Sequence, residues 1–220
     1  PAFACVQCHG HPYDPFKHDD YYRFMDFFNN SRDEDTFDDY PVLREYKGQD
    51  STSLVELKNW LHNHADQQRA DEMIRFVKTL QPSINSLVGD EFINAELSDT
   101  KWLVFRNHGS NRFKQVGLDG KNILIYKYQS YLPGGVWQIR LDNVDGPLVK
   151  EVRLPKTKGW DFAQLSFDEV EGAHDLYFTY SNPNLKDPRS NGLKFDWLYF
   201  TTEFPGKNAN GYQEAKNDFW

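Results

Sequence analysis

The stretch Val136-Trp137-Gln138-Ile139-Arg140-Leu141-Asp142 alternates apolar and polar side chains over most of its length. This period of two is typical of a β-strand that buries one face. Turn sequences such as Pro133-Gly134-Gly135 and Asp145-Gly146-Pro147 flank it on both sides. Six further segments show the same period, at residues 91–97, 122–128, 148–154, 163–167, 174–180 and 194–201. Seven or more short strands at this spacing predict an antiparallel β-sandwich.

Before residue 90 the apolar residues follow a helical period instead. Aromatic residues and Met25 recur at spacings of three and four between residues 19 and 28, as on a helix. Ser53 and Glu56 have the spacing of a capping box, which predicts the start of a second helix. A third helix is expected to end before Pro82, because proline has no N–H to donate. The apolar face of this third helix holds Ala70, Met73, Phe76, Val77 and Leu80.

The change of period predicts a multidomain α + β protein. We expect a helical region at residues 1–88, a β-sandwich at residues 91–201 and a C-terminal extension at residues 202–220. Residues 1–90 contain 9 basic and 16 acidic side chains, whereas residues 91–220 contain 16 and 17. Neither part has a basic cluster of the kind that binds phosphate backbones. The charge pattern therefore argues against nucleic acid as a partner.

The segment Cys5-Val6-Gln7-Cys8-His9 has the form CxxCH. This spacing lets both thiols form thioether bonds to one porphyrin, and the adjacent imidazole can then bind the iron. The motif predicts covalently bound haem c at Cys5, Cys8 and His9. A zinc site that shares these three side chains is the alternative, but it would need a fourth ligand nearby. The chain has no other cysteine, so the sequence offers no disulfide.

The sequence around the motif supports a resemblance. It contains Gly10-His11-Pro12-Tyr13-Asp14-Pro15, then Asp20-Tyr21-Tyr22 and Phe27-Phe28-Asn29-Asn30. Residues 4–35 thereby resemble the cytochrome-like region of the large exported planctomycete-type cytochrome c proteins. The resemblance implies a periplasmic, cell-surface or secreted location. It also implies that other chains, or further parts of a longer precursor, complete the protein and its haem pocket.

The second axial ligand of the iron stays open at this point. Met73 is the leading candidate, because a thioether on an apolar helix face could bind the iron. Packing in the hydrophobic core is the alternative role for Met73. His18, His62 and His64 are further candidates, each with an exposed helix or loop position as its alternative. Met25 is expected to pack among its aromatic neighbours.

Five phrases between residues 91 and 201 point to a second family. They are Gly135-Val136-Trp137-Gln138-Ile139-Arg140-Leu141-Asp142, Gly146-Pro147-Leu148, Lys158-Gly159-Trp160, Gly172-Ala173-His174-Asp175-Leu176-Tyr177 and Phe195-Asp196-Trp197-Leu198-Tyr199-Phe200. In this order they resemble a family 6 carbohydrate-binding module. The resemblance implies a jelly-roll sandwich that holds a glycan and one structural calcium ion.

The resemblance also implies where a glycan would bind. Trp160 falls where the family commonly places an aromatic platform for the flat face of a sugar ring. A core position is the alternative for Trp160. Lys194 stands where the family often has Asn, two residues before the Asp-Trp pair. Phe113 is a candidate for the second aromatic side chain of the site.

For calcium, the family pattern maps onto Glu96 in the first strand and Asp196 in the last. Asn94, on the same strand face as Glu96, could supply a third oxygen ligand. In the alternative interpretation these three residues are ordinary polar residues of exposed strands.

These features predict an extracytoplasmic electron-transfer protein. The sandwich would dock the haem region on a polysaccharide, the cell surface or a redox partner protein. A structural or adhesive glycan-binding subunit with incidental haem is one alternative, and a haem redox enzyme is the other. The chain has no convincing Ser/His/Asp arrangement or carboxylate pair, which favours electron transfer over enzyme activity. No apolar run approaches the roughly 18 residues of a membrane-spanning helix.

Overall fold

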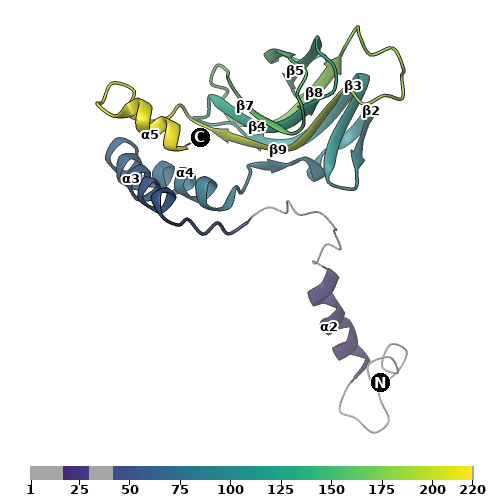
Figure 1. Cartoon of the computed structure of the whole chain (residues 1–220). Coiled ribbons are helices and arrows are strands. Elements are labelled where there is room, and N and C mark those ends of the chain that lie inside the picture. The colour runs from purple at the N-terminus through teal and green to yellow at the C-terminus, as the bar shows by residue number, and fades with distance from the viewer. Residues whose placement is uncertain (1–16, 30–41, 220) are drawn as a thin grey trace. The chain divides into compact units, whose positions relative to one another are not determined.

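The computed structural model describes residues 17–29 and 42–219, and the chain divides into two compact units, Pro1–Asp39 and Tyr40–Trp220. In the first unit, helix α2 (His18–Asn29) confirms the helix that the aromatic spacing predicts (Figure 1). The haem motif lies outside the described residues. The cytochrome-like character of this region is therefore not confirmed and remains a prediction.

The second unit combines three helices with nine strands among its described residues. Its helices are α3 (Gln49–His64), α4 (Gln67–Thr79) and α5 (Tyr212–Phe219), with the short 3-10 helix η1 (Ser86–Val88). Its strands are β1 (Ile84–Asn85), β2 (Asp90–Ser98), β3 (Trp102–Gly117), β4 (Ile123–Ser130), β5 (Gly135–Leu141), β6 (Leu148–Leu154), β7 (Asp161–Ser166), β8 (Ala173–Ser181) and β9 (Leu193–Thr201). Each of the seven predicted segments coincides with one of these strands.

All strand pairs are antiparallel, and the strands follow the order β6-β5-β8-β3-β9-β4-β7, with β1 beside β9 and β2 beside β3. Strand β3 links the two layers of the fold. Its first part, Leu103 to Phe105, pairs with β9, and its later part, Gly109 to Gly117, pairs with β8. Between them His108 has a left-handed backbone, φ 56°, where the strand changes partner.

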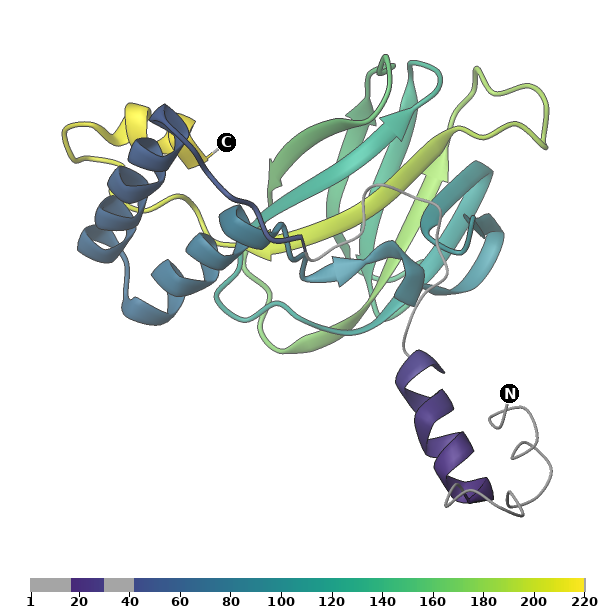
Figure 2. The same cartoon turned by 60° about the horizontal axis from the view of Figure 1, so that its bottom comes forward.

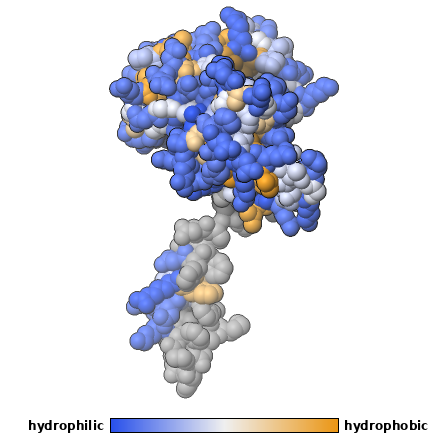
Figure 3. All heavy atoms as spheres, turned by 90° about the vertical axis from the view of Figure 1, so that its left-hand side faces the viewer, coloured by the Kyte–Doolittle hydropathy of each residue, from blue (hydrophilic) through white to orange (hydrophobic). Residues whose placement is uncertain are grey.

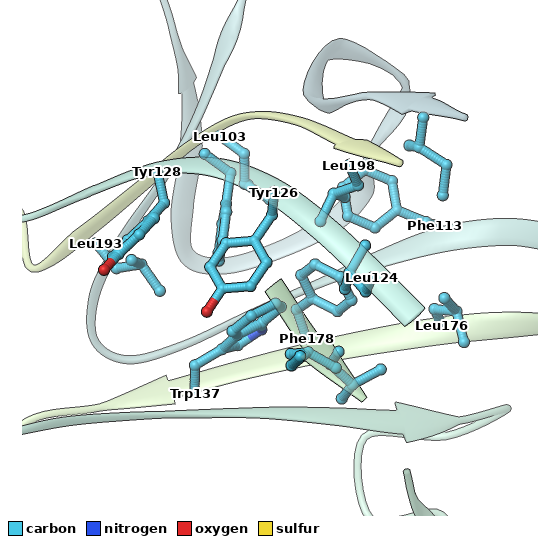
Figure 4. Packing of buried hydrophobic residues seen from close by; sticks show 14 of the residues in the cluster. Leu103, Phe113, Leu124, Tyr126, Tyr128, Trp137, Leu176, Phe178, Leu193 and Leu198 are labelled. Atoms are coloured by element: carbon cyan, nitrogen blue, oxygen red, sulfur yellow. The ribbon is translucent and has the colours of Figure 1, made fainter. Parts of the chain in front are cut away.

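The two layers enclose an aromatic core, which confirms the predicted antiparallel β-sandwich. Trp137 of β5 lies at the centre, fully buried, with Tyr126 of β4 and Phe195 of β9 facing it from the other layer. The ring centroids of Trp137 and Tyr126 are 4.9 Å apart, and those of Trp137 and Phe195 are 4.7 Å apart. Figure 4 shows Tyr126 and Trp137 converging with Phe178 between the strands. Burial of such large rings is the main stabilising contribution to the sandwich.

A second core lies between the helices and one end of the outer face of β4 and β9. Helices α3, α4 and α5 cover this end (Figure 2). Phe76 of α4 stacks on Tyr199 of β9, with ring centroids 3.8 Å apart and planes at 5°. Ala215 and Phe219 of α5 complete the same cluster. The opposite side of the helices presents a mostly hydrophilic surface with scattered apolar patches (Figure 3).

This second core joins residues from both sides of the domain boundary that the change of period suggests. The sequence places a boundary between residues 88 and 91, whereas helices α3 and α4 belong to the same compact unit as the sandwich. The C-terminal extension also belongs to it, since the indole Nε1–H of Trp60 donates to the carbonyl of Pro205 at 3.0 Å. The helices pack here because the outer face of β9 carries Trp197 and Tyr199. These large aromatic side chains give the apolar faces of the helices a hydrophobic surface to bury against.

Candidate functional site

The other end of the same outer sheet face, away from helices α3, α4 and α5, carries two tryptophans and two lysines. Trp102 begins β3, Trp160 directly precedes β7, and Lys127 and Lys194 lie on β4 and β9. These four strands are neighbours in the order β3-β9-β4-β7, and β4, β7 and β9 lie side by side in Figure 1. Because side chains alternate along a strand and the residues next to Trp102, Lys127 and Lys194 point into the core, these three point outward. We call this set of four residues the tryptophan face.

The two indole rings form an angled platform. Trp102 and Trp160 are both half-buried, their ring centroids are 5.8 Å apart, and their planes meet at 46°. A ring inserted between two parallel aromatic planes needs a van der Waals contact of about 3.5–4.0 Å on each side, or about 7–8 Å in all. The tryptophans are too close to form such a slot. A sugar could therefore pack only against the outside of this pair of rings.

The Lys194 ammonium lies against both rings. Its Nζ is 3.8 Å from the ring centroid of Trp102 and 5.4 Å from that of Trp160, within the range of cation–π attraction. Burial lowers the pKa of Lys194, and the carboxylates of Asp99 and Asp196 act in the opposite direction. Trp160 and Lys194, which the family resemblance assigns to the same glycan site, therefore lie close together.

A buried ion pair lies beside the platform. Lys127 Nζ is 2.8 Å from Asp196 Oδ2, and their side chains are only 7% and 1% exposed. The same ammonium is 5.5 Å from the ring centroid of Trp160. Asp196 is thus part of the support of the tryptophan face, with its charge compensated by a lysine of the neighbouring strand.

The predicted calcium ligands have other partners in the structure. Asp196 pairs with Lys127, whereas Glu96 is exposed and pairs with Arg106 at 2.5 Å. Asn94 donates through Nδ2 to the carbonyl of His108 at 3.3 Å. Within residues 17–29 and 42–219, no three His, Cys, Asp or Glu side chains form a group that could hold a metal ion. Calcium at these residues stays a prediction.

The aromatic residue that lies beside Trp160 is Trp102, and the predicted Phe113 lies elsewhere. Phe113 is 1% exposed and packs edge-on against Phe178 in the sandwich core, so it cannot reach a ligand. Trp102 follows a tight hairpin turn in which Asp99 and Thr100 both have left-handed backbones. Trp160 also directly follows a turn sequence, Lys158-Gly159. A tryptophan directly after a turn is therefore the sequence feature by which Trp102 could have been recognised.

The candidate axial ligands fall at different places. Met73 is 1% exposed in the second core, where packing against helices and sheet accounts for its burial. His62 and His64 are exposed on α3, and the ring of His64 stacks on Trp60 with centroids 4.1 Å apart. His18 and Met25 belong to α2 of the first unit. Met73 thus packs in a hydrophobic core, which was the alternative to its role as an iron ligand.

A family model matches residues 2–33. It is PSCyt2, described as a protein of unknown function (DUF1549). No curated protein matches the chain. None of the helices in the described ranges is both long and apolar enough to cross a membrane.

Several solved carbohydrate-binding modules are similar to the sandwich in structure. A family 6 module from Clostridium cellulolyticum in complex with xylose is 19% identical, with a TM-score of 0.46, over 55% of this chain and 99% of that chain. A β-1,3-glucan-binding family 6 module from Bacillus halodurans is 18% identical, with a TM-score of 0.45, over 54% and 94%. A module from Clostridium stercorarium in complex with cellobiose is 14% identical, with a TM-score of 0.46, over 55% and 92%.

Proposed function

We propose that the second unit binds a polysaccharide on the tryptophan face, outside the cytoplasm. The observation that carries this proposal is the pair of half-buried indole rings at the end of the sheet away from the helices. Sugar rings have flat C–H faces, which pack on exposed aromatic surfaces and leave the hydroxyls free for polar partners. The angle of 46° between the rings suits two successive sugars of a chain better than one enclosed sugar.

The surroundings of the rings support binding rather than catalysis. The charged groups beside them include Lys101, whose Nζ is 5.8 Å from the ring centroid of Trp102, Lys127, which is paired with Asp196, and Lys194, which lies on the rings. Cleavage of a glycosidic bond ordinarily uses two carboxyl groups that flank it. The one buried carboxylate at the tryptophan face is held by a lysine, so a binding module fits the geometry better than a glycosidase.

Affinity electrophoresis tests this function directly. The full chain should migrate more slowly in native gels that contain a soluble polysaccharide, because bound protein is held by the matrix. Gels with xylan, hydroxyethylcellulose, β-1,3-glucan, polygalacturonate and alginate cover neutral and acidic chains. A protein of similar size without a sugar site supplies the reference mobility. Equal relative mobility in every gel would reject the proposal.

The CxxCH motif favours a second function for the first unit. We infer that Cys5 and Cys8 hold haem c through thioether bonds and that His9 is an axial ligand of its iron. Haem supplies one-electron chemistry when bound, and the protein tunes it through ligand type and burial. In that case the polysaccharide site would dock an electron carrier close to its redox partner.

The haem proposal predicts a property of the unfolded protein. Thioether bonds survive denaturation, so the denatured chain should keep its Soret absorbance and carry the extra mass of one haem. Intact-mass spectrometry and absorbance in guanidinium measure both properties. The variant with Cys5→Ala and Cys8→Ala should lose the cofactor. An intact mass equal to that of the bare sequence, after expression with the haem-attachment machinery, would end this proposal.

A further inference from the structure

The position of Lys194 indicates which charge a ligand of the tryptophan face should have. The residue is half-buried, and its ammonium lies 3.8 Å from the centre of the Trp102 ring. Within the described part of the chain, no carboxylate lies in salt-bridge range of Lys194 Nζ, and no hydrogen bond to this atom is formed. Nearby, Asp196 is engaged by Lys127, and Asp99 accepts the hydroxyl hydrogen of Ser98 at 3.3 Å.

A partly desolvated ammonium without an ionic partner is costly, and an acceptor that reaches it recovers part of that cost. The aromatic face compensates only in part, because cation–π attraction provides no hydrogen-bond acceptor. Lys194 Nζ lies over the Trp102 ring and 5.4 Å from the centroid of Trp160, so a sugar that packs against the remaining exposed surface of the two indoles would have ring substituents beside this ammonium. A carboxylate among these substituents would form a charge-assisted hydrogen bond, which is about twice as strong as a neutral one.

We infer that the polysaccharide bound on the tryptophan face is acidic, with uronic acid units whose carboxylate pairs with Lys194. This inference rests on the proposed function and adds the substrate class to it. The indoles would bind the sugar rings whatever their charge, and Lys194 would select chains that carry carboxylates. A charged hydrogen bond contributes about 1 kcal/mol more than a neutral one, so the preference should be about fivefold to tenfold.

The test compares each acidic polysaccharide with its own carboxyl-reduced form, in which the carboxylate is a primary alcohol and the backbone is unchanged. Polygalacturonate, alginate and hyaluronan are the probes, and affinity electrophoresis of the full chain gives the dissociation constants. We expect at least one acidic form to bind about fivefold to tenfold more tightly than its reduced form. Added salt should weaken only the acidic form, because screening acts on the ion pair.

Two lysine variants locate the effect. Lys194→Met keeps the apolar stem on Trp102 and removes the charge, so it should abolish the preference and keep the affinity for reduced chains. Lys150→Met is the matched control, because Lys150 is also half-buried but lies on β6, at the other end of the strand order. It should leave the preference unchanged.

The outcomes separate the two proposals. Equal affinity of wild-type protein for acidic and reduced chains would overturn the inference and leave polysaccharide binding intact. A preference that survives in folded Lys194→Met would also overturn it. No binding to any chain, acidic or neutral, would reject the proposed function itself. If Lys194→Met does not fold, the wild-type comparison and its salt dependence still decide the question.

Discussion

Replacing Asp196 with Ala is expected to lower the free energy of unfolding by about 3–5 kcal/mol, because it removes the carboxylate that pairs with the buried Lys127 ammonium. Urea unfolding followed by circular dichroism measures the change. The double variant Lys127→Met with Asp196→Leu should recover most of the loss, since it removes both charges and keeps the volume apolar. This result would establish that the two charges act as a pair.

Glu96→Ala is the matched control for this experiment. Glu96 also pairs with a cation, Arg106, but its side chain is 51% exposed. Exposed pairs contribute about 0.2–1 kcal/mol, so this variant should be close to wild type. A loss below about 1 kcal/mol in Asp196→Ala would contradict the assignment of a buried pair. A rise in the melting temperature with calcium that disappears in both variants would support the calcium prediction.

Removing both indoles of the tryptophan face is expected to abolish polysaccharide binding. Anchor residues in a binding site typically contribute at least about 2 kcal/mol each, so Trp102→Ala with Trp160→Ala should weaken binding by about a thousandfold. Each single variant should lose about thirtyfold, and the Trp→Phe variants should lose less because a smaller aromatic ring remains. Affinity electrophoresis against the best wild-type ligand gives these ratios.

Phe92→Ala controls for the loss of an exposed aromatic ring elsewhere. Phe92 lies on β2, outside the tryptophan face, and is 37% exposed. Its removal should leave the affinity unchanged. A double tryptophan variant that unfolds like wild type and still binds would place the glycan site on another surface.

Much of the fold is accessible from the sequence, because apolar and polar residues alternate along several of its strands. The segments at residues 148–154 and 174–180 agree with β6 and β8 to within a residue at each end. Strand β3 was missed because polar residues at 106–108 interrupt its alternation where the strand changes partner. The helix start was also misplaced: α3 begins at Gln49, so Ser53 lies inside the helix and caps nothing.

The site was predictable only in part. Trp160 and Lys194 could be placed together because the family resemblance gives the turn and the strand that hold them. Trp102 could not, since its position depends on the hairpin register of the strand that was missed. For Asp196, the sequence indicates that an acid in an apolar strand needs a partner. It does not indicate whether that partner is a metal ion or Lys127, which comes from a neighbouring strand.

The most direct test of the central claim is the indole N–H region of a proton–nitrogen NMR spectrum during titration with an acidic oligosaccharide. The chain has 6 tryptophans, whose signals can be assigned with single Trp→Phe variants. The signals of Trp102 and Trp160 should shift together and saturate, whereas those of the buried Trp137 and Trp197 should move little. A saturable titration that shifts other tryptophans and leaves Trp102 and Trp160 in place would contradict the assignment of the tryptophan face as the glycan site.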